Sequence, residues 1–304
     1  MKAVWGPIRQ LHILNLGGGK QSTRLYLGFL GGEYLDGNGE PIRINAAVFA
    51  DTGDERQATY KNIEWLQQLG GPPILVRRHP NITLGSALLT GMNGHGGRFV
   101  TIPAFTTPRE GDYRNKGITR RQCTKEFKTT IIERTIRREF VGLQPRQPLP
   151  ATVEVHRYFG ISWDERSRAV DIERRLTLNR KGKPLRGYFV HFPLLDPARR
   201  ETRMDCDRYL RAHVPHEVIK SACKFCPFHS DQEWQSIKDD PDQSDWNAVV
   251  QIDRALRTEG TVANRKFNYP LYLHEACRPI DQIAFDNNQE KLGFLMECSG
   301  MCGH

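Results

Sequence analysis

The sequence predicts an α/β protein with a doubly wound, mostly parallel sheet and a smaller, cysteine-rich helical region after it. An apolar run at Ile13–Leu16 ends in three glycines and leads into a helical pattern at Leu25–Leu30. A second unit of the same kind follows, with an apolar strand at Ala46–Ala50 and a helix at Tyr60–Leu69. Strands that alternate with helices in this way build parallel βαβ units, so we expect a parallel sheet.

The loop of residues 17–23, with the sequence GGGKQST, predicts a phosphate site. Glycines allow backbone N–H groups to turn inward, and the helix that starts there adds a partial positive charge. The loop is not a Walker loop, because Gln21 follows Lys20, and it lacks the third glycine of a dinucleotide fingerprint.

An acidic loop, Asp51–Glu55, follows the second strand. In open α/β sheets, nucleotides bind at the edge formed by the carboxyl ends of the strands, where this loop is expected. The alternative is that these acids only cap the following helix.

Two further blocks complete the pattern: RRQCTKEFK at residues 120–128, and GISWDERSR at residues 160–168 after a predicted strand at Val153–Tyr158. With the glycine loop and the D-T-G-x-E block, they resemble the phosphoadenosine-phosphosulfate (PAPS) reductase family. That family belongs to the PP-loop ATP pyrophosphatase, or adenine-nucleotide α-hydrolase, superfamily. The resemblance covers residues 12–168, and the later C-x-x-C-P and E-C-x-G-M-C-G pieces look like a phage and actinobacterial branch. Gly17 and Gln21 stand where the family's S-G-G-x-D-S loop has Ser and Asp.

The resemblance implies a HUP/PP-loop fold that binds ATP, or PAPS, with Mg²⁺. Lys20 and Ser22 would contact the phosphates, and Asp51 would hold Mg²⁺ or the ribose, so these three are the expected catalytic residues of the nucleotide site. Arg121, Lys128 and Arg168 would clamp phosphates or a polyanionic acceptor. The complete set of implied nucleotide contacts is Gly17, Gly18, Gly19, Gln21, Ser22, Thr23, Asp51, Thr52, Gly53, Glu55, Arg121, Lys128, Ser162, Asp164 and Arg168.

Composition predicts a globular cytoplasmic protein without a membrane partner. The chain has 304 residues, of which 38% are hydrophobic, and it contains neither a membrane-length apolar run nor a signal-peptide core. We expect an adenine-nucleotide domain at residues 1–200 and a cysteine-rich helical region at 201–304, with the boundary near 196–205. Helices are predicted there at Asp205–His213, Asp231–Lys238 and Trp246–Arg257.

The net charge of +9 is unevenly spread, since residues 109–147 and residues 165–203 each hold eleven Lys/Arg and five Asp/Glu. Such a field suits a nucleotide with several phosphates, a nucleic acid such as DNA or tRNA, or both. The alternative is that Arg134, Arg137 and Arg138 only form a solvated helix face.

Seven cysteines in a cytoplasmic protein are read as metal ligands or redox groups before disulfides. Cys223 and Cys226 form a C-x-x-C-P turn, which can be half of a zinc site, half of an iron–sulfur site or a redox pair. We favour a 4Fe–4S cluster over zinc, which would use His229, and over no metal at all. The expected cluster ligands are Cys123, Cys206, Cys223 and Cys226.

Cys298 and Cys302 lie in a tail of small residues that partly resembles the reactive C-terminal tail of PAPS reductases, so they are expected catalytic thiols. Such a tail suits a thiol that visits a substrate and then a reductant or a sulfur donor. The alternative is a frayed terminus or a second metal half-site.

The sequence therefore favours an ATP-dependent, iron–sulfur-dependent sulfur transferase that acts on a nucleic acid or a related acceptor. The first alternative is a PAPS or adenylylsulfate reductase that releases sulfite and uses a thioredoxin-like reductant. The second is a non-catalytic nucleotide-sensing or DNA-binding accessory protein, motivated by Gln21. The family resemblance also makes a homodimer an expectation.

Overall fold

A five-stranded parallel sheet forms the centre of the protein. The computed structural model describes residues 9–90, 102–179, 181–258 and 268–285. The strand order is β3-β2-β1-β6-β7, and every neighbouring pair is parallel, which confirms the predicted doubly wound α/β fold. The strands are β1 (Arg9–Leu16), β2 (Ala46–Asp51), β3 (Ile74–Arg78), β6 (Val153–Phe159) and β7 (Tyr188–His191).

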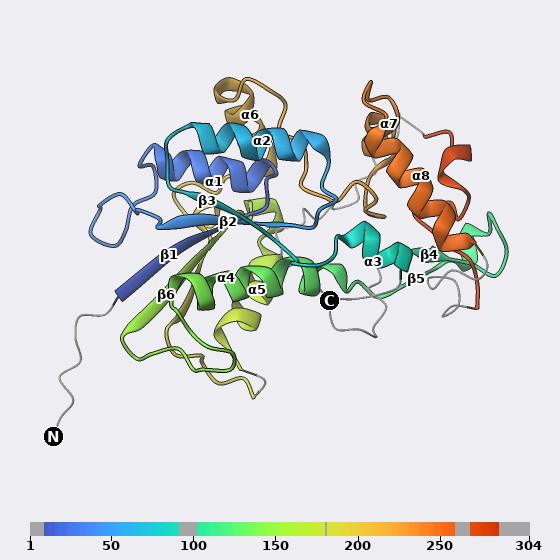
Figure 1. Cartoon of the computed structure of the whole chain (residues 1–304). Helices are drawn as coiled ribbons and strands as arrows, with labels where there is room; N and C mark the ends of the chain where they lie inside the picture. The colour runs from blue at the N-terminus through green and yellow to red at the C-terminus, as the bar shows by residue number, and fades with distance from the viewer. Residues whose placement is uncertain (1–8, 91–101, 180, 259–267, 286–304) are drawn as a thin grey trace.

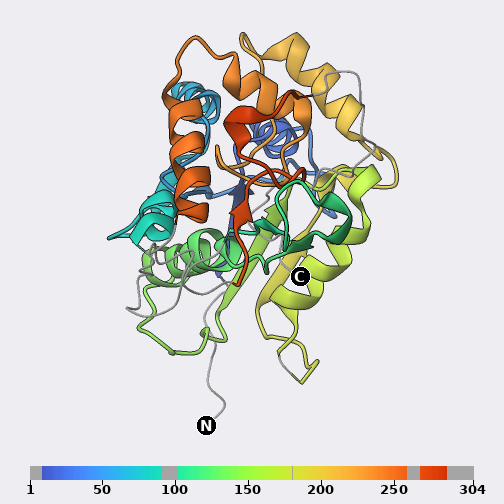
Figure 2. The same cartoon turned by 90° about the vertical axis from the view of Figure 1, so that its right-hand side faces the viewer.

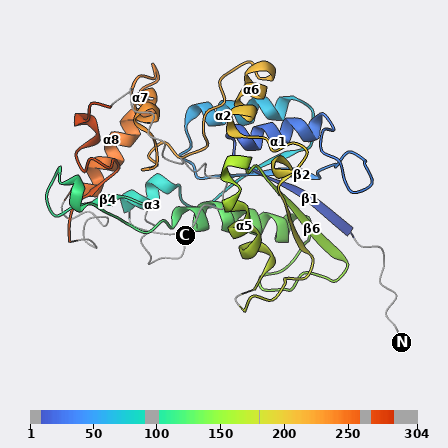
Figure 3. The same cartoon turned by 180° about the vertical axis from the view of Figure 1, so that it is seen from behind.

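Helices cover both faces of this sheet (Figures 1 and 3). One face carries α1 (Lys20–Leu30), α2 (Gln57–Gln68) and α6 (Arg203–His213). The other carries α5 (Ser167–Thr177) and a helix over residues 124–140, in which α4 (Thr130–Thr135) lies between π-helical turns at Thr124–Thr129 and Ile136–Phe140. The alternation of β1 explains the two layers, because Leu14 packs into the first core and Ile13 into the second.

A further core, smaller than the packing on the two faces of the sheet taken together, lies beside the sheet. It contains α3 (Leu84–Thr90), α7 (Asp231–Lys238) and α8 (Ser244–Arg257), together with three two-residue antiparallel strands. These strands are β4 (Phe105–Thr106), β5 (Gly117–Ile118) and β8 (Leu271–Tyr272). Figure 2, which faces this end of the molecule, shows the segment around β8 beside the one that contains β4 and β5. Short 3₁₀ turns lie at Tyr113–Asn115, Trp163–Glu165, Pro193–Leu195 and Ile280–Gln282.

The helices predicted after residue 200 are confirmed in place, but they pack in two different cores. Helix α6 lies on the main sheet, where Cys206 is fully buried among residues of the α1 layer. Helices α7 and α8 instead share the smaller core with Leu84 and Phe127. The division of the chain at residue 200 stays a prediction.

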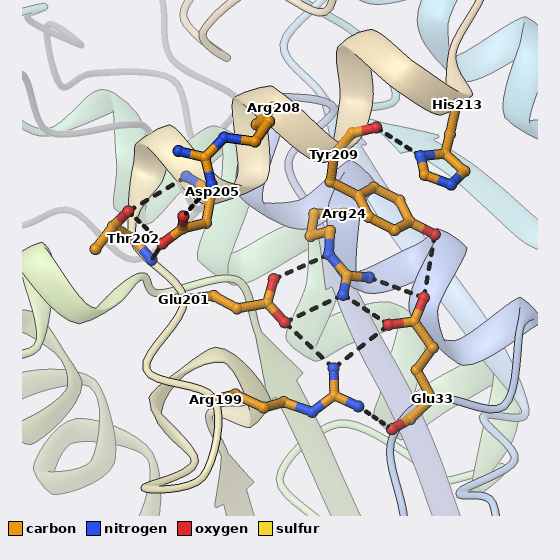
Figure 4. A network of polar contacts seen from close by, with 9 residues as sticks. All are labelled: Arg24, Glu33, Arg199, Glu201, Thr202, Asp205, Arg208, Tyr209 and His213. Carbon is orange, nitrogen blue, oxygen red and sulfur yellow. Dashed lines mark hydrogen bonds and ion pairs between the residues drawn. The ribbon is translucent and has the colours of Figure 1, made fainter.

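A charged network fastens α6 and the loop before it to α1 (Figure 4). The buried Arg24 guanidinium of α1 donates to Glu33, at 2.6 Å for the shortest bond, and to Glu201, at 2.9 Å for the shortest. Arg199 contacts the same two carboxylates at 3.3 Å each, and Tyr209 of α6 stacks on Arg24 at 3.9 Å. Because these groups come from α1, the loop after it, the loop before α6 and α6 itself, the network fixes how α6 packs against α1.

Candidate functional site

The glycine loop lies at the point where the strand order reverses, between β1 and β6. Gly18 has φ +79°, and a Cβ atom there would lie 2.8 Å from the Thr59 side chain of α2, so only glycine fits. The Gly18 carbonyl accepts a hydrogen bond of 3.0 Å from Asn62 of α2. Ser221, which is far away in sequence, donates a hydrogen bond to the Gly17 carbonyl. The loop is therefore held from both sides.

Helix α1 begins directly after the loop, and its first turn holds no acidic residue. The N-terminal end of the helix thus keeps its partial positive charge. Lys20 pairs with Asp207 of α6 at 2.6 Å, while the Ser22 hydroxyl donates to the Gly19 carbonyl at 3.2 Å. Thr23 is fully buried, and its hydroxyl accepts from Asn62 at 2.9 Å.

Gln21 connects the glycine loop to the loop after β6. Its side-chain amide donates to the Ser162 hydroxyl and, at 2.6 Å, to the Glu165 carboxylate. The same carboxylate pairs with Arg168 and Arg203, each at 2.6 Å. An aspartate in place of Gln21 would be a second negative group beside Glu165, so glutamine suits these surroundings better than an acid would.

The backbones of the two loops are in direct contact. A Cβ atom on Gly160 would lie 2.8 Å from the backbone of Gln21 and of Ser22. Because backbone cannot give way as a flexible side chain can, the approach requires glycine at this position. The glycine loop and the 160–168 block, which resembled one family's site, are thus assembled across the switch point of the sheet.

Asp51, at the end of β2, is buried and engaged by three groups. Its carboxylate accepts from the Gly53 N–H at 2.7 Å and from the Tyr60 hydroxyl at 2.8 Å, and it pairs with Arg78. The side chains of this loop do not cap α2: the N-cap is Arg56, and the Gln57 N–H donates to Asp245 at 3.1 Å. The interpretation of the acidic loop as a simple helix cap is therefore wrong.

Glu55 points from the same loop toward the 124–140 helix. It is fully buried, accepts from Thr52 at 3.0 Å and pairs with the buried Lys128 at 3.0 Å. Lys128 and Glu55, both predicted as nucleotide contacts, hold each other in the structure.

Three of the four predicted metal ligands line one small cavity. Cys123, Cys223 and Cys226 lie there with the polar residues Thr52, Arg121, Thr124 and Lys128, and apolar residues close the rest of the wall. The two cysteines of the C-x-x-C turn reach this place because residue 223 forms a β-bridge with Glu55 and the Lys224 N–H donates to the Asp54 carbonyl at 2.9 Å. The segment of residues 221–226 therefore touches both the glycine loop and the acidic loop.

The surroundings of the thiols favour a thiolate at Cys226. A hydrogen bond from Cys223 lowers the pKa of Cys226 against the effect of burial, and the charges of His229, Arg121 and Lys220 act in the same direction. The same hydrogen bond, in which the Cys223 thiol donates its proton to Cys226, raises the pKa of Cys223, and burial adds to this effect. One thiolate beside one protonated thiol is a chemically reactive arrangement.

The fourth predicted ligand, Cys206, lies apart from this cavity. It belongs to the core between α1, α6 and the sheet, whereas the other three thiols belong to the smaller core. Within the described residues, no three His, Cys, Asp or Glu side chains are arranged so that they could hold a metal ion. The four-thiol set is thus not brought together here, and no chemical step is assigned below to a metal. The predicted catalytic thiols Cys298 and Cys302 lie outside the described residues.

Sequence reasoning missed several residues of this site. Glu165, not Asp164, contacts Gln21, and Asp164 instead accepts from the Arg203 backbone at 3.1 Å. Arg203 and Ser221 were not predicted at all. They act through contacts with Glu165 and with the glycine loop, respectively.

No family model matches the chain, and comparison with curated proteins and with solved structures finds no match either. What the geometry defines is an α/β protein whose parallel sheet has a Rossmann- or HUP-like strand order. Among the described residues, no helix is long and apolar enough to cross a membrane.

Proposed function

We propose that the chain binds an adenine nucleotide at the switch point of its sheet and uses ATP to adenylate an acceptor, which then receives sulfur. The observation that carries the proposal is the position of residues 221–226, which contact the glycine loop through Ser221 and bring Cys223 and Cys226 beside Thr52. A glycine loop in contact with a segment that carries a pair of thiols is the arrangement that such a sulfur transfer requires.

The glycine loop would hold the phosphates through its backbone N–H groups and the start of α1. Lys20 would exchange Asp207 for a phosphate oxygen, because its present ion pair is partly exposed and costs little to break. Arg121 lines the thiol cavity and would neutralise charge on the leaving pyrophosphate.

The proposed reaction has two balanced steps. An acceptor oxygen attacks the α-phosphorus of ATP, a new P–O bond forms, and the bond to the β-phosphate breaks with release of pyrophosphate. A sulfide or persulfide sulfur then attacks the activated acceptor carbon and displaces AMP. A persulfide donor would transfer its terminal sulfur to the Cys226 thiolate and leave as a thiolate. After that sulfur has attacked the acceptor, Cys223 would attack the Cys226 sulfur, break the bridging S–S bond and release the thiolated acceptor, and an external dithiol would reduce the resulting Cys223–Cys226 disulfide.

A metal at the thiol cavity is the competing use of the same thiols. Cys123, Cys223 and Cys226 would hold an iron–sulfur cluster only after a rearrangement, since no three described side chains are arranged to hold a metal, and Cys226 would then not be free to carry sulfur. Anaerobic purification followed by iron, zinc and sulfide analysis tests it. Cys223→Ser should lower the metal content, and Cys206→Ser should not, because Cys206 lies in the other core. Equal losses in both variants would favour the four-thiol set.

The experiment that tests the nucleotide chemistry is pyrophosphate release from ATP by the full chain, with RNA, DNA and no acceptor compared. Lys20→Ala and Ser22→Ala should abolish release while the circular dichroism spectrum stays unchanged. Lys61→Ala, on the exposed side of α2, is the matched control and should retain full activity. Unchanged release in both loop variants would refute the assignment of the loop.

Two observations favour a second candidate, a nucleotide-sensing protein without turnover. Gln21 stands where the family has an acid, and the Asp51 carboxylate is engaged by Arg78, Tyr60 and Gly53. A carboxylate held this way must break contacts before it can bind Mg²⁺. ATP binding without pyrophosphate release, whichever acceptor is added, would support the nucleotide-sensing protein. Release of sulfite from PAPS would instead support a reductase.

A further inference from the structure

A groove of about 320 Å³ runs along the outer side of the 124–140 helix. Between the helix and the loop that follows it, the groove is lined mainly by basic and polar side chains. They are Lys125, Thr129, Thr130, Glu133, Arg134, Arg137, Arg138 and Gln144, with Leu143 and Pro145 at one end. The opposite side of the same helix packs into the core of the sheet through Ile131, Ile132 and Ile136.

The cations of this groove are not neutralised by the protein. Within the described part of the chain, Lys125, Arg134 and Arg138 form no ion pair with a carboxylate. The one acid of the groove, Glu133, pairs with Arg157 at 3.3 Å, and Arg137 is held by the Tyr188 hydroxyl at 3.0 Å.

The second basic stretch of the sequence differs in this respect. Four of its arginines have carboxylate partners: Arg168, Arg174, Arg199 and Arg203. The sequence gives both stretches the same excess of charge. The structure distinguishes them, because three cations of the first stretch that lack a carboxylate partner, Lys125, Arg134 and Arg138, share one concave surface.

The groove has the length and chemistry of a site for a chain of phosphates. At the α-helical rise of about 1.5 Å per residue the distance from Lys125 to Arg138 is at most roughly 20 Å, and the π-helical turns at both ends shorten it, so the groove lies alongside up to about six phosphates of one nucleic-acid strand. A single nucleotide is too short to reach all three free cations. Arg, Lys, Thr and Gln side chains are the usual donors to phosphate oxygens.

The lining also indicates how the nucleic acid is held. Its residues include no aromatic side chain on which an unpaired base could stack. Contacts would therefore be made to the sugar–phosphate backbone, which carries no sequence information and is most densely charged in a duplex.

We propose that this groove binds the phosphate backbone of a nucleic-acid duplex without sequence preference. The helix connects it to the thiol cavity, because Cys123, Thr124 and Lys128 line the cavity while Lys125 and Thr129 line the groove. That the bound duplex is also the acceptor rests on the proposed function, whereas the binding itself does not.

The test measures binding of a labelled 25-base-pair duplex of mixed sequence to the full chain by fluorescence anisotropy between 50 and 200 mM salt. The groove variant combines Lys125→Ser, Arg134→Ser and Arg138→Ser. The control variant combines Lys181→Ser, Lys183→Ser and Arg186→Ser, which removes the same charge from an exposed turn of the other basic stretch.

The groove variant should bind at least tenfold more weakly than the control at 100 mM salt. Its slope of log affinity against log salt should fall by about 0.9 for each lost phosphate contact, hence by two to three for the three cations. The proposal would be overturned if the control variant lost as much affinity for the duplex as the groove variant. It would also be overturned if polyglutamate of matched charge displaced the labelled duplex as well as unlabelled duplex does.

ATP binding measured on the same proteins separates this inference from the proposed function. The three groove residues lie outside the nucleotide loops, so the groove variant should bind ATP as the wild type does. Duplex binding through the groove without ATP binding would refute the proposed function alone. ATP binding and pyrophosphate release without duplex binding would refute the groove alone.

Discussion

Replacing Arg24 with methionine removes the central charge of the network in Figure 4 and keeps most of the aliphatic packing. The guanidinium makes four hydrogen bonds to Glu33 and Glu201, and its side chain is only 5% exposed. Although burial opposes the charged form, the hydrogen bond to Glu33 and the nearby carboxylates raise the pKa of Arg24 above its ordinary value. Without Arg24, two carboxylates face each other with less compensation.

The expected loss of stability depends on the groups that still compensate Glu33 and Glu201 once Arg24 is gone. Removing one partner of a buried ion pair costs about 3–5 kcal/mol when nothing replaces it. Here Arg199 still lies 3.3 Å from both carboxylates, and the Glu33 side chain is 28% exposed, so water and Arg199 compensate in part. We therefore expect a loss of about 3 kcal/mol for Arg24→Met, and about half of that for Arg24→Lys, which keeps the charge but not the planar fork.

Urea unfolding followed by circular dichroism measures this loss. Arg174→Met is the matched control, because the pair that Arg174 forms with Asp171 is largely exposed and should contribute under about 0.5 kcal/mol. Adding Glu201→Gln to Arg24→Met should recover part of the stability, since one unpaired carboxylate is then gone. A loss for Arg24→Met no larger than that of the control would show that the network does not stabilise the fold.

Three further predictions concern the site and the sheet. Gly160→Ala places a methyl group 2.8 Å from the glycine-loop backbone, so it should lower the free energy of unfolding by about 1–3 kcal/mol and weaken ATP binding. Gly37→Ala is the control, because a Cβ atom there has nothing within 4 Å, and it should change neither quantity. Gln21→Glu places a second carboxylate against Glu165, so it should lower the melting temperature more at pH 7.5 than at pH 5, where protonation of the introduced carboxyl group relieves the repulsion. An equal drop in melting temperature at both pH values would contradict this. Burial, and then two neighbouring histidine rings, lower the pKa of His191 from 6.5 to about 4, so its neutral form stabilises the fold above pH 6.5 and the contribution is lost as pH falls toward 4. Between pH 7.5 and pH 5 the free energy of unfolding should fall by at most about 2 kcal/mol on this account, after solvent screening. In His191→Gln this difference between the two pH values should be smaller, as measured by urea unfolding.

The main sheet could be predicted because its signals are local. Each apolar strand of the βαβ units is followed directly by its loop and helix, so the residues that define the unit are neighbours in sequence. The small antiparallel sheet gave no such signal. Its strands, such as Phe105–Thr106 and Leu271–Tyr272, have two residues each, which is too short for any alternation to appear.

The prediction of Cys206 as a cluster ligand is based on the number of cysteines alone and ignores which face of its helix Cys206 occupies. Cys206, Leu210 and Val214 follow one another at intervals of four, and all three are buried. That spacing describes the apolar stripe of an amphipathic helix, so it predicts a core thiol at Cys206. The same argument applies to Ser162 and Glu165: residues three apart in a helical turn share a face, which favours Glu165 over Asp164 as the residue that contacts Gln21 together with Ser162.

The contact between Ser221 and the glycine loop could not be predicted, because it joins residues 204 positions apart and involves an ordinary serine. Under the proposed function, this contact is what couples the thiols to the glycine loop. Ser221→Ala leaves the Gly17 carbonyl without this donor, which should cost about 1 kcal/mol and loosen both the loop and the C-x-x-C turn.

If the two are one site, Ser221→Ala should weaken ATP binding and also change the rate at which Cys226 reacts with a thiol reagent. Ser236→Ala, which removes a hydroxyl that accepts from Arg56 at 3.0 Å on α7, is the matched control and should change neither. A Ser221→Ala protein with altered ATP binding but unchanged thiol reactivity would mean that the cavity is held by Glu55 and Asp54 alone. The thiols would then be neighbours of the nucleotide loop without being coupled to it.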